Sequence, residues 1–123
     1  MAYEAGFIAD RVGHIPSGLT VTQGAGARTN AVTLHALSGA ITTDTSSLAA
    51  EAAAKFTVTN NQVAIGDCVA VCERSGSNGG ATKISVTTVA AGSFQICVAN
   101  NNASGGTAET GAIIINFAVV KAG

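Results

Sequence analysis

The stretch KISVTTVAAGSFQICVAN at residues 83–100 decides the fold. In its second half Phe94, Ile96 and Val98 alternate with smaller or more polar residues. A period of two is typical of a β-strand with one buried face. The Ala-Gly dipeptide before this run suits a tight reversal, because glycine adopts backbone conformations that other residues avoid. We therefore predict a β-hairpin over this stretch.

The same texture extends along most of the chain. Short runs rich in Thr, Val and Ile are separated by Gly, Asn, Ser and Asp, a spacing that favours a sandwich or jelly roll over a βα alternation. The sequence predicts an all-β fold, a single antiparallel β-sandwich or jelly-roll-like domain over residues 19–123, with an extended N-terminal arm over residues 1–18. The eight predicted strands are Leu19–Gln23, Ala31–His35, Ala40–Thr43, Phe56–Asn60, Asp67–Arg74, Lys83–Ala90, Ser93–Asn100 and Ile113–Lys121.

Two stretches stand out from this pattern. The run IIINFAVV at residues 113–120 is apolar on both faces apart from Asn116, which predicts a central strand or one covered by another subunit. Residues 46–55 have helical character, with a serine available as an N-cap and Glu51 four residues before Lys55. We expect one short helix or turn there.

The composition excludes several classes of function. Charged residues make up 11% of the 123 residues and the net charge is -1, unlike the basic surface of a nucleic-acid-binding protein. Aromatic residues are 4%, too few for base-stacking platforms. No apolar segment approaches the roughly 20 residues that span a bilayer, and no signal peptide is expected. The sequence therefore predicts no nucleic-acid partner and no membrane partner.

Three cysteines, Cys68, Cys72 and Cys97, are an odd number. On one strand Cys68 and Cys72 share a face but lie about 13 Å apart, too far for a disulfide. A pairing of Cys97 with either one across neighbouring strands stays open, although reduced, buried thiols are the preferred interpretation. The isolated His14 and His35 provide no zinc spacing, so no metal site is predicted.

The remaining candidates for chemistry are weak. The run QGAGART at residues 23–29 lacks the phosphate-loop pattern and predicts a connecting turn. Nothing in the sequence brings Asp44 and Glu51 together as an acid pair, and no nucleophile motif surrounds a Ser or Cys. We predict no enzyme activity and no cofactor. The isolated charges Arg28, Lys55, Arg74 and Lys121 are interpreted as solvated surface groups or interface ion pairs.

Several fold and turn segments carry a resemblance to a known family. They are Thr20–Gln23, Arg28–Leu34, Ser38–Thr42, Phe56–Asn60, Ala90–Phe94 and Ile115–Lys121. Through them the chain resembles small virion structural proteins of tailed bacteriophages, similar to capsid decoration, or cement, proteins. The resemblance implies a β-sandwich on the outer capsid surface, commonly a homotrimer, that clamps major capsid protein subunits. It also implies assembly in the host cytoplasm.

Residues 1–18 fall outside the resemblance. They hold apolar side chains in a segment too short to bury them, and we expect these to contact the capsid or a neighbouring subunit: Tyr3, Phe7, Ile8, Val12 and Ile15. The leading hypothesis is a non-enzymatic protein that stabilises the capsid. The alternative is a receptor- or glycan-binding domain of a phage fibre or tail protein, which predicts an exposed aromatic or acidic cluster on the loops.

Overall fold

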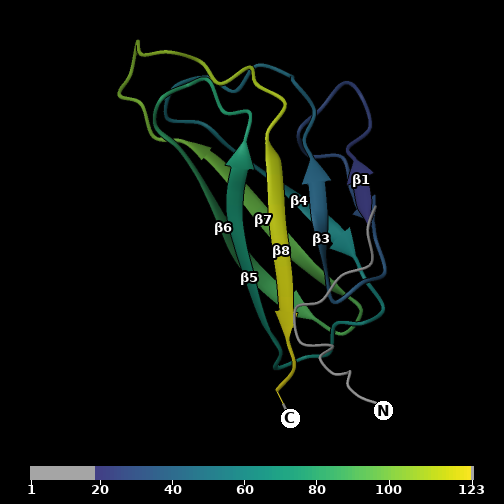
Figure 1. Ribbon diagram of the computed structural model, residues 1–123. Helices are drawn as coiled ribbons and strands as arrows, with labels where there is room; N and C mark the ends of the chain where they lie inside the picture. The colour runs from purple at the N-terminus through teal and green to yellow at the C-terminus, as the bar shows by residue number, and fades with distance from the viewer. Residues whose placement is uncertain (1–18, 123) are drawn as a thin grey trace.

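The computed structural model describes residues 19–122, which form a β-sandwich of two four-stranded sheets (Figure 1). The first sheet has the strand order β1-β3-β8-β5 and the second has the order β2-β4-β7-β6. The strands are β1 (Thr20–Thr22), β2 (Val32–Thr33), β3 (Ser38–Thr42), β4 (Ala53–Thr59), β5 (Cys68–Ser75), β6 (Thr82–Ala90), β7 (Ser93–Asn100) and β8 (Ile114–Val120).

All eight predicted strands are present, and the sandwich is confirmed. The prediction of a wholly antiparallel arrangement is wrong at two edges, where the short strand β1 pairs parallel to β3 and β2 pairs parallel to β4. Of the two alternatives expected for residues 46–55, the turn is present at Ala50 and Glu51, and the helix is wrong. The last three residues of this stretch, from Ala53, begin β4, where they alternate between exposed and buried positions. Burial of one strand face outweighs a weak helical preference.

The core lies between the two sheets and consists of alternate residues of each strand. Phe56 of β4 is opposite Ile96 of β7 in the second sheet. Phe94 crosses the interior to Phe117 of the first sheet, with ring centroids 5.4 Å apart and an interplanar angle of 54°. This tilted contact is a favoured arrangement of aromatic rings. One hydrophobic cluster therefore joins both sheets.

Strand β8 is central, as predicted, because it pairs with β3 on one side and β5 on the other. Its inward residues Ile115, Phe117 and Val119 are buried. Gly39 of β3 lies opposite Phe117, and a Cβ atom there would come within 2.8 Å of Leu34 and 3.2 Å of the Phe117 ring. Glycine is required at this position because the two side chains occupy the space.

The connections divide between two ends. What we call the upper end holds the loops at residues 23–31, 43–52, 76–81 and 101–113, and the lower end holds the loops at residues 34–37, 60–67 and 91–92 together with the described C-terminal residues (Figure 1). No helix of the described part of the chain is long and apolar enough to cross a membrane.

Candidate functional site

The upper end is organised around a buried carboxylate, Glu109. Its side chain is fully inaccessible to solvent, and its backbone bridges to Leu48. The carboxylate accepts hydrogen bonds from the Ser77 hydroxyl at 2.7 Å and from the Thr82 hydroxyl. It also accepts three backbone N–H groups, each at 2.9 Å, from Asn78, Gly79 and Gly111. A single side chain thereby ties the loop at residues 76–81 to the loop at residues 101–113.

The pKa of Glu109 reflects two opposing effects. Burial alone raises the pKa, because removal from water penalises the charged form. The hydrogen bonds from Thr82, Ser77, Asn78 and Gly111 outweigh burial and lower the pKa from 4.5 to about 2. The carboxylate therefore stays ionised at neutral pH without an ion pair to any side chain of residues 19–122, stabilised by neutral donors that the fold holds in place.

Arg28 completes the upper end from a third loop. It is 3% exposed, and its guanidinium donates to the Ser46 carbonyl, the Thr43 hydroxyl at 3.0 Å and the Gly111 carbonyl at 2.9 Å. A fourth contact reaches the backbone carbonyl of Glu109 at 3.3 Å. Burial lowers the pKa of Arg28, and the charges of Glu109 and Asp44 act in the opposite direction. The interpretation of Arg28 as a solvated or interface charge is therefore wrong.

Close backbone packing explains the glycines of this cluster. A Cβ atom on Gly76 would lie 2.0 Å from the Ala112 carbonyl oxygen, and one on Gly111 would lie 1.9 Å from the Gly76 oxygen. Gly76 also has a φ of 101°, which favours glycine. Sequence reasoning missed the cluster. The available signal was a lone Glu109 and a lone Arg28, each in an otherwise uncharged Gly-rich or Ala-rich loop.

Amide side chains fix the rest of the upper surface. Asn100, at the end of β7, is 1% exposed and donates to the carbonyls of Leu48 and Thr107, both at 2.9 Å. Two hydrogen bonds join Asn78 and Thr110. The Asn78 side-chain amide donates to the Thr110 hydroxyl, and the Thr110 backbone N–H donates to the Asn78 side-chain oxygen. The upper end is therefore a polar surface whose loops are cross-linked by hydrogen bonds.

The lower end carries a different carboxylate, Asp67. Its oxygens accept hydrogen bonds from the Lys121 ammonium, from the Ala64 N–H at 2.8 Å and from the Ala122 N–H at 3.0 Å. The hydrogen bond from Lys121 is the largest of the effects that lower the pKa of Asp67 to about 2. Lys121 thus pairs within its own chain, and its side chain is 48% exposed.

Exposed apolar side chains gather at this same lower end. The exposed large hydrophobic residues of the described chain are Leu37 at 47%, Ile65 at 77% and Val120 at 57%. Leu37 and Ile65 lie in lower loops, and Val120 ends β8, next to Lys121. The carbonyl of Leu37 accepts the Val119 N–H at 2.7 Å, which holds its loop against β8. The lower end therefore combines exposed apolar side chains with the Asp67–Lys121 ion pair.

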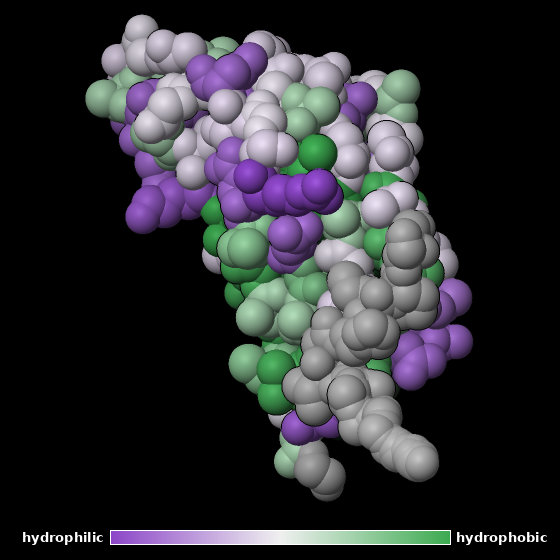
Figure 2. Space-filling view, viewed as in Figure 1, coloured by the Kyte–Doolittle hydropathy of each residue, from purple (hydrophilic) through white to green (hydrophobic). Residues whose placement is uncertain are grey.

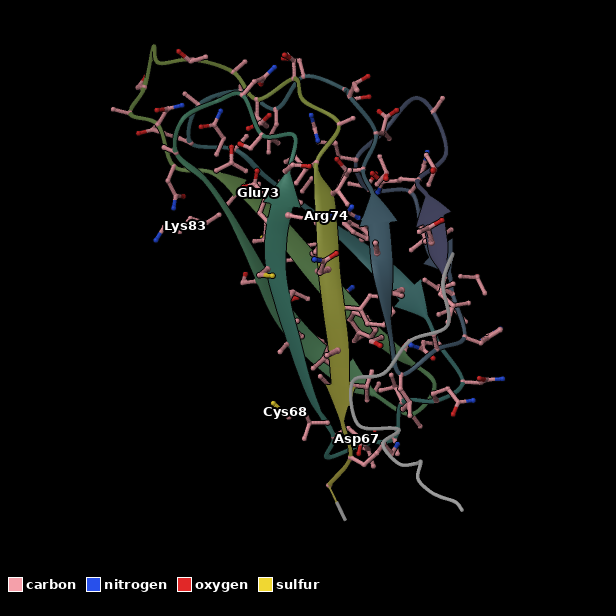
Figure 3. The ribbon with its side chains drawn as sticks, viewed as in Figure 1. Asp67, Cys68, Glu73, Arg74 and Lys83 are labelled. Atoms are coloured by element: carbon pink, nitrogen blue, oxygen red, sulfur yellow. The ribbon has the colours of Figure 1, made fainter. Side chains whose placement is uncertain are left out.

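The two outer sheet faces also differ in charge. On the first sheet, the outward residues of β5 from Cys68 to Cys72 are uncharged. The outward residues of β8, β3 and β1 are uncharged as well. We call this the neutral face, made up of Thr20, Thr22, Ser38, Ala40, Thr42, Cys68, Ala70, Cys72, Ile114, Asn116, Ala118 and Val120. Figure 2 shows pale and green colours over the lower parts of β5 and β8. Figure 3 places the charged residues at the ends of β5, Asp67 below and Glu73 and Arg74 above.

The second sheet carries two lysines on its outer face. Lys55 of β4 and Lys83 of β6 are both exposed, and Cys97 of β7, opposite Lys55, lies between these strands. The outward neighbours are mostly Thr, Ser and Gln. Solvated lysines suit a face that remains in contact with water. The neutral face contains no lysine.

The cysteines and the described histidine take no part in a cluster. All three cysteines are free, and Cys68 and Cys72 lie on one strand face as predicted. The expectation that the thiols are buried is wrong, because Cys68 and Cys72 are exposed and Cys97 is half-buried. His35 is exposed and accepts the Asn61 N–H at 3.0 Å. Among residues 19–122 no group of three or more His, Cys, Asp or Glu could hold a metal ion.

The predicted contact residues Tyr3, Phe7, Ile8, Val12 and Ile15 lie outside the described residues. The chain enters the described part at Leu19, beside the middle of β3, where the Leu19 carbonyl accepts the Ala40 N–H at 3.2 Å. Comparison with known proteins finds no family, no curated protein and no solved structure that matches this chain. Fold and site therefore define a β-sandwich domain with a polar upper end and an apolar lower end.

Proposed function

We propose that this protein is a non-enzymatic structural protein of a bacteriophage virion, which decorates the assembled capsid as a homotrimer and stabilises it by binding the major capsid protein. The observation that carries this proposal is the exposure of Leu37, Ile65 and Val120 at one end of the domain. Apolar side chains gathered on one surface and bordered by polar groups mark protein-protein contacts. The lower end is accordingly the capsid-facing end.

The N-terminal arm can act together with this end. Residues 1–18 join the domain at Leu19, beside the middle of β3, and an extended segment of that length spans about 60 Å. Their apolar residues, among them Phe7 and Ile8, are candidate contacts to the capsid or to a neighbouring subunit. The arm and the exposed apolar loops then act on the same partner, and the hydrogen-bonded upper end is the outward surface of the particle.

Stabilisation follows from mass action. A protein that binds the assembled shell but not its separate subunits adds its binding free energy to the free energy of disassembly. No covalent chemistry is needed. The loop of Leu37 is already held against β8 by the Val119 N–H, and a loop that is fixed in advance loses little conformational entropy on binding.

Co-sedimentation of the purified chain with purified capsid shells tests the proposal. Ile65→Asp places a charge in the apolar end and should reduce binding about tenfold or more, because burial of an unpaired charge is costly. Ser104→Asp, in an exposed upper loop, is the matched control and should bind normally. Removal of residues 1–17 should leave a folded trimer, verified by light scattering, that no longer decorates shells. A full chain that stays in the supernatant contradicts the proposal.

One feature favours a second candidate, a receptor- or glycan-binding domain of a fibre or tail. The upper end presents amides held in place, such as Asn78 and Asn102, and such groups can bond sugar hydroxyls. A glycan array measured with the full chain distinguishes the two. Specific binding that Asn78→Ala abolishes, without binding to shells, favours this candidate.

A further inference from the structure

The neutral face is a surface without a described occupant. Its central positions are small, with Ala70, Ala118 and Ser38 opposite one another across β5, β8 and β3. A shallow groove runs along β5 and β8 over Ala70, Cys72, Asn116 and Ala118. Lys55 and Lys83 lie on the outer face of the other sheet, whereas the outward residues of this one are uncharged below Arg74, from Cys68 to Cys72 of β5 and along β8, β3 and β1.

The size of the neutral face indicates what can cover it. Four strands about 4.8 Å apart, with a common length of about five residues, offer roughly 300 Å². A stable interface between two proteins buries about 800 Å² on each partner. The face alone is therefore too small for a second folded copy, but it suits an extended segment laid across the strands.

The chain's own first 18 residues join the described chain at Leu19, next to this face. Leu19 bonds Ala40 of β3, and Thr20 opens β1, the edge strand of the same sheet. An extended segment of this length reaches about 60 Å, several times the width of the sheet. Because residue 18 is followed directly by Leu19 and β1, the effective concentration of the arm at the neutral face is high.

From these observations we propose that the segment from Tyr3 to Ile15 docks on the neutral face of its own chain. The apolar residues of the segment, Phe7, Ile8 and Val12 among them, supply the cover for the small residues of the groove. This inference goes beyond capsid decoration, since it concerns the protein alone. A capsid that binds the arm must first draw it off this face.

Trypsin provides the test, because Arg11 is the one Lys or Arg among residues 1–18. Docking protects the Arg11 peptide bond in the full chain. Ala118→Glu places a charge in the centre of the neutral face and should speed cleavage after Arg11 about tenfold, since the charge disfavours an apolar cover. Ala99→Glu is the matched control, an equally half-buried alanine facing outward on β7 of the other sheet, and should leave the rate unchanged. Circular dichroism verifies that both variants are folded.

Two outcomes overturn the inference. Equal cleavage rates in the unmodified chain and in Ala118→Glu show that the arm does not use this face. Protection that disappears on dilution shows that the arm of a second copy is the occupant, because docking within one chain is independent of concentration. Neither outcome bears on binding to capsid shells, so failure here and failure of the proposed function are distinguishable.

Discussion

The two ends of the sandwich hold carboxylates with similar pKa values that arise from different causes. Glu109 at the upper end and Asp67 at the lower end both have pKa values of about 2. Neutral hydroxyl and backbone donors stabilise Glu109, which is fully buried, whereas Asp67 depends first on the half-exposed Lys121. A carboxylate held by the fold and one held by a mobile partner charge should respond differently to mutation and salt. The comparison also separates the end that fixes loops from the end that we propose faces the capsid.

Glu109→Gln should give the largest loss. The amide keeps the size of the side chain but turns an NH₂ group toward donors, so that several N–H and O–H groups lose their acceptor. We expect the free energy of unfolding to fall by about 3–5 kcal/mol, as when one partner of a buried charged network is removed. Urea denaturation measures it. Glu51→Gln, at an exposed position, is the control and should change stability by less than about 0.5 kcal/mol. Equal effects would show that the cluster is not a structural centre.

Arg28→Met should follow, with a loss of about 2–4 kcal/mol, because methionine fills much of the volume but leaves the carbonyls of Ser46 and Gly111 without donors. Arg74→Met, in the exposed bulge of β5, is the matched control and should be close to neutral. The prediction can also be checked by hydrogen exchange, which should accelerate in the loops at residues 43–52 and 101–113. A variant as stable as the control would contradict the assignment of Arg28 to the upper cluster.

The contrast between the strands and this cluster shows what the sequence can predict. Alternation in residues 93–100 is local, and so the strand and its buried face follow directly. The partners of Arg28 do not, because Gly111 is 83 residues away in sequence and only the completed sandwich brings the loops together. The parallel pairings of β1 and β2 were missed for a similar reason, since two or three residues of strand carry no information on direction.

Acidification should lower stability at both ends. The folded-state pKa values of Glu109 and Asp67, both about 2, lie below the ordinary values of 4.5 and 3.8 that these groups have in the unfolded chain. Their stabilisation is therefore fully present above about pH 5 and is lost as the pH falls toward 2. Urea midpoints measured from pH 7 to pH 3 should decline, and Glu109→Gln should flatten the curve. An unchanged slope in that variant would show that other carboxyl groups dominate.

The smallest effect should come from the lower ion pair. Lys121→Met removes one donor to Asp67, but the N–H groups of Ala64 and Ala122 remain, and Lys121 is half in solvent. The loss should therefore be smaller than for Glu109→Gln or Arg28→Met. It should also shrink in 1 M NaCl, where the Debye length is about 3 Å, because the Lys121 ammonium is half in solvent and its attraction to Asp67 is screened there. The Glu109→Gln loss should persist in the same salt, since ions do not reach buried hydrogen bonds. If salt reduces both losses equally, the two carboxylates do not differ in the way their surroundings indicate.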